Sequence, residues 1–158
     1  MKLAIIITLL SFNLFAQDVS MNVRGHQISL GMNIDDVWDL LAPDFNVIED
    51  KAGNFFVSDN MDSPVCVVYF KNDKAVKIIK DWGTTYKTNV GQVFKVLWNI
   101  LKENEKDLNE VAIIPQQIFN SKGDQSNILI YLKENRYLEI TIRFNVTILE
   151  VLEDLENK

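Results

Sequence analysis

Two reactive side chains occur only once in this chain of 158 residues, namely His26 and Cys66. Zinc and iron centres built on these residue types need several ligands, so the sequence excludes a His- or Cys-rich metal site. A Cys66–His26 nucleophilic dyad stays open, because distant positions can meet in a fold. We interpret Cys66 instead as a small buried hydrophobe within the apolar run 65–70. His26 is interpreted as a partly exposed strand residue beside Gly25.

Carboxylates are numerous, with 22 Asp and Glu residues, so a hydrolase using a carboxylate pair stays possible by residue type. Three of them, Asp35, Asp36 and Asp39, are explained by the solvated face of a helix. The loop 59–63 offers oxygen ligands for calcium but lacks the spacing of a calcium-binding loop. The chain contains neither a Gly-x-Ser-x-Gly motif nor a glycine-rich phosphate loop. We therefore predict no catalytic activity, no metal and no cofactor.

Aromatic residues supply the binding candidates. Trp82 and Tyr86 flank a polar connection that contains a glycine, and both residue types are enriched at interface hot spots. We predict that they form a partner-binding patch; the alternative is that Trp82 covers the core between two halves of the chain. Trp38 and Phe94 lie on apolar helix stripes and are predicted to be core residues.

Residues 1–16 are predicted to be a cleavable signal peptide. A short positive start precedes the apolar run 3–15, and Ala16 provides a small residue before cleavage at Gln17. That run is shorter than the roughly 20 residues needed to span a bilayer. Gln17 stands where a lipoprotein would carry cysteine, so we expect no lipid anchor and no transmembrane segment. The mature chain, 17–158, is expected to be a single periplasmic or secreted domain.

The elements that must position these side chains suggest an α+β fold. Asn33 caps a predicted helix over 33–41, and a second helix is expected from Thr88 or Asn89. Thr147-x-x-Glu150 has the form of a capping box and predicts a short C-terminal helix. Period-two apolar patterns and turn residues predict strands at 46–50, 55–59, 65–70, 76–82, 111–114, 117–120, 127–133 and 137–144. Connections this short favour helices packed on a mostly antiparallel sheet.

The two halves of the chain resemble one another. The segment 33–41 aligns without gaps to 89–97, with apolar positions matched and aromatic residues sharing the sixth place. Each segment then precedes a set of strands. The sequence thus suggests a tandem helix-plus-strands repeat, with half-repeats at 28–82 and 86–144.

A short segment also resembles a known group of proteins. Ile-Ser-Leu-Gly-Met-Asn-Ile-Asp-Asp-Val at 28–37, followed by Leu-Leu-Ala-Pro at 40–43, is similar to a helix-opening pattern of small envelope proteins. That group includes the accessory lipoprotein of outer-membrane β-barrel assembly and the β-lactamase-inhibitor-like fold. The resemblance implies a two-layer module, sometimes in tandem, that binds other proteins without catalysis. Ala42-Pro43 replaces the Gly-x-Pro of the pattern, and the lipid-anchoring cysteine is missing.

The net charge of the chain limits the classes of partner that it is expected to bind. The net charge is −6 and becomes −7 when the predicted leader, with Lys2, is removed. An acidic chain without a basic run is a poor ligand for nucleic acid. We expect an exported, non-enzymatic module that binds a protein partner, of the adaptor or inhibitor type. The alternative is a small-ligand binder with a pocket between the second helix and the sheet, and a carboxylate-based hydrolase is a third reading.

Overall fold

A computed structural model describes residues 19–86, 90–103, 112–118, 125–133 and 135–154. Strands account for 58% of these residues and helices for 19%, so the predicted α+β balance is wrong and the protein is mostly β. The predicted leader lies outside the described residues. Neither helix in these ranges is long and apolar enough to cross a membrane.

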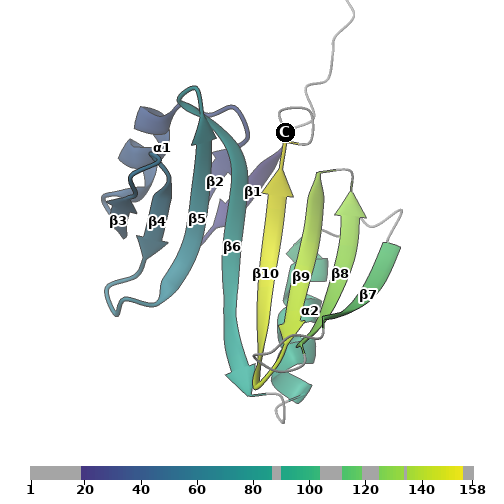
Figure 1. Ribbon diagram of the computed structural model, residues 1–158. Coiled ribbons are helices and arrows are strands. Elements are labelled where there is room, and N and C mark those ends of the chain that lie inside the picture. Colours follow the sequence, from purple (N-terminus) through teal and green to yellow (C-terminus); the bar gives the residue numbers. More distant parts are fainter. Residues whose placement is uncertain (1–18, 87–89, 104–111, 119–124, 134, 155–158) are drawn as a thin grey trace, which may run out of the picture.

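Eight strands form one antiparallel sheet in the order β3-β4-β5-β6-β10-β9-β8-β7, and two more form a separate hairpin (Figure 1). The hairpin consists of β1 (Ser20–Val23) and β2 (His26–Ser29). The strands of the large sheet are β3 (Asn46–Glu49), β4 (Phe55–Ser58), β5 (Pro64–Lys71), β6 (Lys74–Tyr86), β7 (Ala112–Ile118), β8 (Gln125–Lys133), β9 (Arg136–Ile142) and β10 (Asn145–Glu153). The helices are α1 (Ile34–Leu41) and α2 (Val90–Glu103).

The first helix begins where the sequence predicts. The side chain of Asn33 accepts a hydrogen bond from the backbone N–H of Asp35, which satisfies one of the free donors of the first turn. The hairpins β3–β4 and β5–β6 also lie at the predicted places. Gly53 has a φ of 80°, a value that glycine adopts without steric cost, and it turns the chain between β3 and β4.

The predicted C-terminal helix is wrong, because residues 145–153 form strand β10 at the centre of the sheet. β10 pairs with β6 on one side and β9 on the other, and its neighbours Val151 and Leu152 are both buried. Val151 and Leu152 point to opposite faces of a central strand, and two adjacent apolar residues of this kind imitate a helical stripe. Two ladders of backbone hydrogen bonds override the local capping pattern at Thr147.

The two halves of the large sheet have the same order of elements. In the first half α1 is followed by β3, β4, β5 and β6, and in the second α2 is followed by β7, β8, β9 and β10. The halves meet at β6 and β10, which are antiparallel partners at the middle of the sheet. We call the β6–β10 pair the seam. The repeat of 28–82 and 86–144 stays a prediction, and the second set of strands extends to Glu153.

Each half has its own hydrophobic core on the same face of the sheet. The hairpin β1–β2 and helix α2 both lie behind the sheet in Figure 1. The first core joins the hairpin and α1 to inward residues of β4, β5 and β6, including Phe55, Val68 and Ile78. The second core packs α2, through Ile100, against Leu138 and other inward residues of β9 and β10.

Two aromatic residues predicted to be core residues are exposed. Trp38 is 41% exposed and Phe94 is 66% exposed. Helix α1 has only eight residues and buries Val37 and Leu41, so Trp38 lies at the rim with its ring edge against Phe55. Helix α2 packs its residues Val93, Leu97 and Ile100 in the second core and leaves Phe94 and Trp98 exposed on its flank. An apolar stripe wider than the contact face produces both errors.

Candidate functional site

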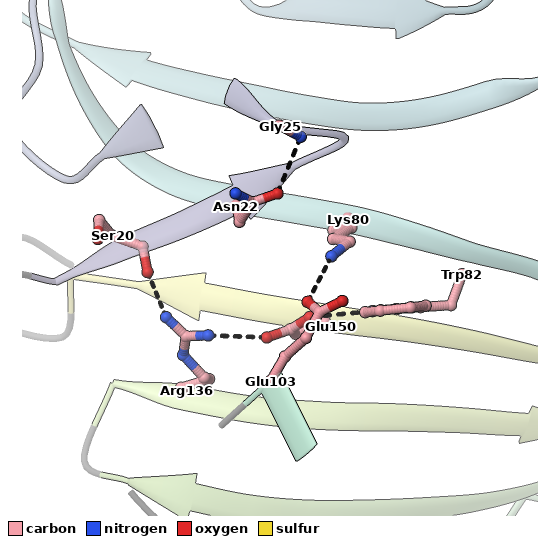
Figure 2. A network of polar contacts seen from close by, with 8 residues as sticks. All are labelled: Ser20, Asn22, Gly25, Lys80, Trp82, Glu103, Arg136 and Glu150. Atoms are coloured by element: carbon pink, nitrogen blue, oxygen red, sulfur yellow. Dashed lines mark hydrogen bonds and ion pairs between the residues drawn. The ribbon is translucent and has the colours of Figure 1, made fainter. Parts of the chain in front are cut away.

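A polar network occupies the helix side of the sheet at the seam, between the two cores (Figure 2). Its centre is Glu150 of β10, which is 1% exposed. One carboxylate oxygen, Oε1, accepts a hydrogen bond from Nη1 of Arg136 at 2.8 Å, and the other, Oε2, accepts one from Nε1 of Trp82 at 2.9 Å. A buried carboxylate is costly unless it is paired and hydrogen-bonded, and both oxygens of Glu150 meet that condition.

Arg136 connects this carboxylate to the N-terminal hairpin. Its Nη2 donates to the backbone carbonyl of Ser20 on β1. The same residue on β9 therefore binds β10 and β1 at once, and Glu150 adds β6 through Trp82. The strands β1, β6, β9 and β10 are thus joined in one network, and its members point toward one another in Figure 2.

Lys80 is the second buried charge of this region. Its ammonium lies 3.1 Å from Oε2 of Glu103, the last residue of α2, and 3.8 Å from the centre of the Trp82 ring. Lys80 is 8% exposed, so both the ion pair and the cation–π contact act in a partly desolvated setting. These contacts attach the end of α2 to the seam.

A pocket of about 300 Å³ opens beside these residues. Its walls come from the hairpin, from β5 and β6 and from the end of α2, and they comprise Asn22, Val23, Arg24, Val65, Lys80, Asp81, Trp82 and Glu103. This volume is at the lower end of the range for small-molecule sites. Both cations in the wall are already paired, Lys80 with Glu103 and Arg24 with Asp59, so neither is free to bind an anionic ligand.

Of the predicted partner-binding pair, Trp82 lies in the wall of this pocket, half-buried against the second core and bonded to Glu150. This position matches the alternative in which Trp82 covers the core between the two halves. Tyr86 is the last residue of β6, where its backbone is paired with Asn145. The side chain of Tyr86 lies outside the described residues.

Cys66 and His26 are held in separate surroundings. Cys66 is buried, and burial raises the pKa of its thiol to about 12, so the nucleophilic thiolate is scarce at neutral pH. His26 is a half-buried strand residue, as predicted, with Nε2 3.1 Å from the carboxylate of Asp44 and its ring edge-on to Phe45. These contacts are structural and do not form the Cys66–His26 dyad.

In the loop 59–63 the carboxylate oxygens of Asp59 already have hydrogen-bond partners. Oδ1 of Asp59 accepts hydrogen bonds from the backbone N–H groups of Met61 and Ser63, and Oδ2 pairs with Arg24 at 3.0 Å. The hydrogen bond from Arg24, followed by those from Met61 and Ser63, lowers the pKa of Asp59. Within the described ranges no three His, Cys, Asp or Glu residues are grouped to hold a metal ion. Both carboxylate oxygens of Asp59 are engaged by the loop backbone and by Arg24.

A second candidate surface lies on the opposite side of the sheet, which we call the open face. Successive residues of a strand point to opposite faces, so the neighbours of the core residues point away from both helices. The ladder registers place one row of apolar and aromatic residues across seven strands of this face: Ile48, Phe56, Val67, Ile79, Val151, Tyr137 and Tyr131. We call this set the apolar row. Ile48 is 57% exposed and Phe56 is 46% exposed.

Comparisons with known proteins do not narrow these possibilities. No protein-family model, curated protein or solved structure matches the chain. The two candidate sites are therefore interpreted from their own geometry.

Sequence reasoning missed Glu150 and Arg136, the centre of the polar network. Glu150 was assigned to a helix cap, and an acid at that position of a helix needs no partner. The available signal is the period-two pattern of 145–153, in which Glu150 occupies an inward position between Ile148 and Leu152. A glutamate at an inward strand position predicts a buried cation or another donor nearby.

Proposed function

We propose that this chain is an exported, non-enzymatic module that binds a protein partner through the open face of its large sheet. The observation that carries the proposal is the apolar row, which crosses seven strands on a face that no described helix or hairpin covers. The row is most exposed at one end, at Ile48 and Phe56, and exposed apolar residues that lie side by side are typical of interaction sites. Tyrosine and other aromatic residues, here Phe56, Tyr131 and Tyr137, are also enriched in interfaces.

The dimensions of the open face suit a protein ligand. Eight strands spaced ~4.8 Å apart span about 34 Å, and strands of four to thirteen residues, about 7.6 on average, add about 25 Å in the other direction. The resulting area, about 850 Å², is close to the roughly 800 Å² that each partner buries in a standard interface. A small molecule would contact only a fraction of it.

The groups that could serve chemistry support a binding role. Both oxygens of Glu150 accept hydrogen bonds within the network, Lys80 is paired with Glu103, and Cys66 is buried. Glu150 and Lys80 join the two halves, and Cys66 packs in the first core. The resemblance at 28–43 also implies an adaptor or inhibitor that acts by binding. Export to the periplasm or the cell exterior is part of the same proposal.

The test compares two exposed surfaces of the same protein in the cell envelope. The double variant Ile48→Ser/Phe56→Ser changes the open face, and Phe94→Ser/Trp98→Ser changes the exposed flank of α2 as a matched control. Proteins cross-linked in living cells are quantified for each form, after urea unfolding shows that both variants keep the stability of the parent. The proposal expects one cross-linked partner to be lost only with the open-face variant. Loss only with the α2 variant would refute it.

A small-ligand binder is the second candidate, and the specific observation in its favour is the pocket of about 300 Å³ beside Lys80. Native mass spectrometry of the purified protein tests this reading. A bound small molecule that is lost when Asn22→Leu narrows the pocket would support it, and an empty protein would count against it.

A further inference from the structure

Two carboxylates interrupt the apolar surface at the middle of the open face. Leu149 of β10 is in register with Asp81 of β6 on one side and with Glu139 of β9 on the other. Asp81 alternates with Lys80 and Trp82, which both point to the helix side, so its carboxylate lies on the open face. Cross-strand neighbours have Cβ atoms about 5 Å apart, which places the two acids roughly 10 Å apart with Leu149 between them.

These two acids lack cationic partners within the described part of the chain. Oδ1 of Asp81 accepts a hydrogen bond from the backbone N–H of Gly83, and neither Asp81 nor Glu139 forms an ion pair there. The open face does pair another of its acids, because Glu153 lies 3.4 Å from Lys77. The cations are therefore absent from the seam row that holds Leu149, not from the face as a whole.

The negative charge of this face acts on Tyr137, a member of the adjacent apolar row. Tyr137 has a pKa raised to about 12, first by burial and then by the fields of Glu153 and Glu139. The full chain has a net charge of −6, so its long-range field has the same sign. An approaching surface meets an apolar row and, next to it, an uncompensated negative potential.

We propose that the protein surface that docks on the open face is basic, with a lysine or arginine beside an apolar side chain, seated over Leu149 between Asp81 and Glu139. This inference rests on the proposed function and specifies the chemistry of its partner. A second copy of the chain is disfavoured as the occupant, because it would bring a net charge of −6 and the same two acids to the interface. Complementary potentials select the partner and speed its encounter, while the apolar row supplies burial.

The test uses two short blocked peptides of alternating sequence, one of leucine and arginine and one of leucine and glutamate. Each is titrated into the isotopically labelled mature protein, and backbone chemical shifts locate the contact. The arginine peptide is expected to shift residues of β6, β10 and β9 around Leu149, and the glutamate peptide is expected to leave them unchanged. The variant Asp81→Asn/Glu139→Gln should weaken arginine-peptide binding about threefold to tenfold, since exposed charge pairs contribute modestly. The variant Lys77→Gln serves as the matched control and should not weaken it.

Each other outcome has a distinct meaning. Equal shifts with both peptides on the open face would overturn the basic preference while leaving the docking face intact. Arginine-peptide shifts on α2 around Phe94 and Trp98, or none at all, would also overturn the inference. The proposed function is tested by a different experiment, the cross-linking in living cells. It fails if the cross-linked partner is kept when Ile48 and Phe56 are replaced. Association of the protein with itself at the same face, seen by sedimentation, would replace the basic partner with a second copy.

Discussion

Breaking the buried pair of Arg136 and Glu150 from one side should be far more destabilising than removing the pair altogether. Arg136→Met removes the guanidinium from the Glu150 carboxylate, which is 1% exposed, and also removes the bond to the Ser20 carbonyl. Removing one partner of a buried ion pair costs about 3–5 kcal/mol. In the background of Glu150→Gln, Arg136→Met should lower the unfolding free energy by less, because no buried charge is then left without its partner.

The assay is a double-mutant cycle by urea unfolding, followed by intrinsic tryptophan fluorescence. With a denaturant slope of about 2 kcal/mol/M, Arg136→Met should lower the midpoint by about 2 M urea. The cycle should give a coupling of about 1–3 kcal/mol between the two residues. Arg24→Met is the control, because Arg24 is half exposed and its pair with Asp59 should contribute only about 0–1 kcal/mol. Additive effects at Arg136 and Glu150 would refute the buried network as the link across the seam.

Three further predictions concern other parts of the chain. Asn33→Ala should cost about 1 kcal/mol of unfolding free energy through the lost helix cap, measured by urea unfolding, and an unchanged midpoint would show that the cap is dispensable. The raised pKa of Tyr137 means that stability is complete below the unfolded value of 10.0 and falls as pH rises toward about 12. Tyr137→Phe should therefore unfold less steeply with alkali than the parent, and identical alkaline profiles would contradict the assignment. N-terminal sequencing of the exported protein should begin at Gln17, and a retained Met1 would rule out cleavage of the leader.

Local signals in the sequence predict the elements whose formation depends on local contacts. The cap at Asn33 and the hairpins β3–β4 and β5–β6 are of this kind, since a capping side chain or a turn lies within a few residues of its partner. The turn of β5–β6 has positive φ at Asn72 and Asp73, as a tight hairpin requires. Such features depend only on consecutive residues, so they can be predicted without knowledge of the fold.

The candidate sites depend on contacts that no local pattern encodes. Trp82 and Glu150 are 68 residues apart, and Arg136 and Ser20 are 116 apart. The hairpin β1–β2 was missed because its eight strand residues contain only three apolar ones, Met21, Val23 and Ile28, all of them buried against the first core. The assignment of β10 as a helix then hid the seam, because the open face exists only when β10 joins the two halves in one sheet.

The seam reverses the usual polarity of a sheet that is covered on one side. Such a sheet normally places apolar residues toward its helices and polar residues toward water. At the seam, Lys80 and Glu150 point to the covered side, while Ile79 and Val151, their neighbours in sequence, belong to the apolar row of the open face. The inward charges need a dedicated network to offset their desolvation. Of the outward residues, Val151 is already buried within the sheet, with 1% exposed, and Ile79 is half-buried. The network is therefore required by the inward charges alone, and the case for binding at the open face rests on the exposed end of the apolar row, at Ile48 and Phe56.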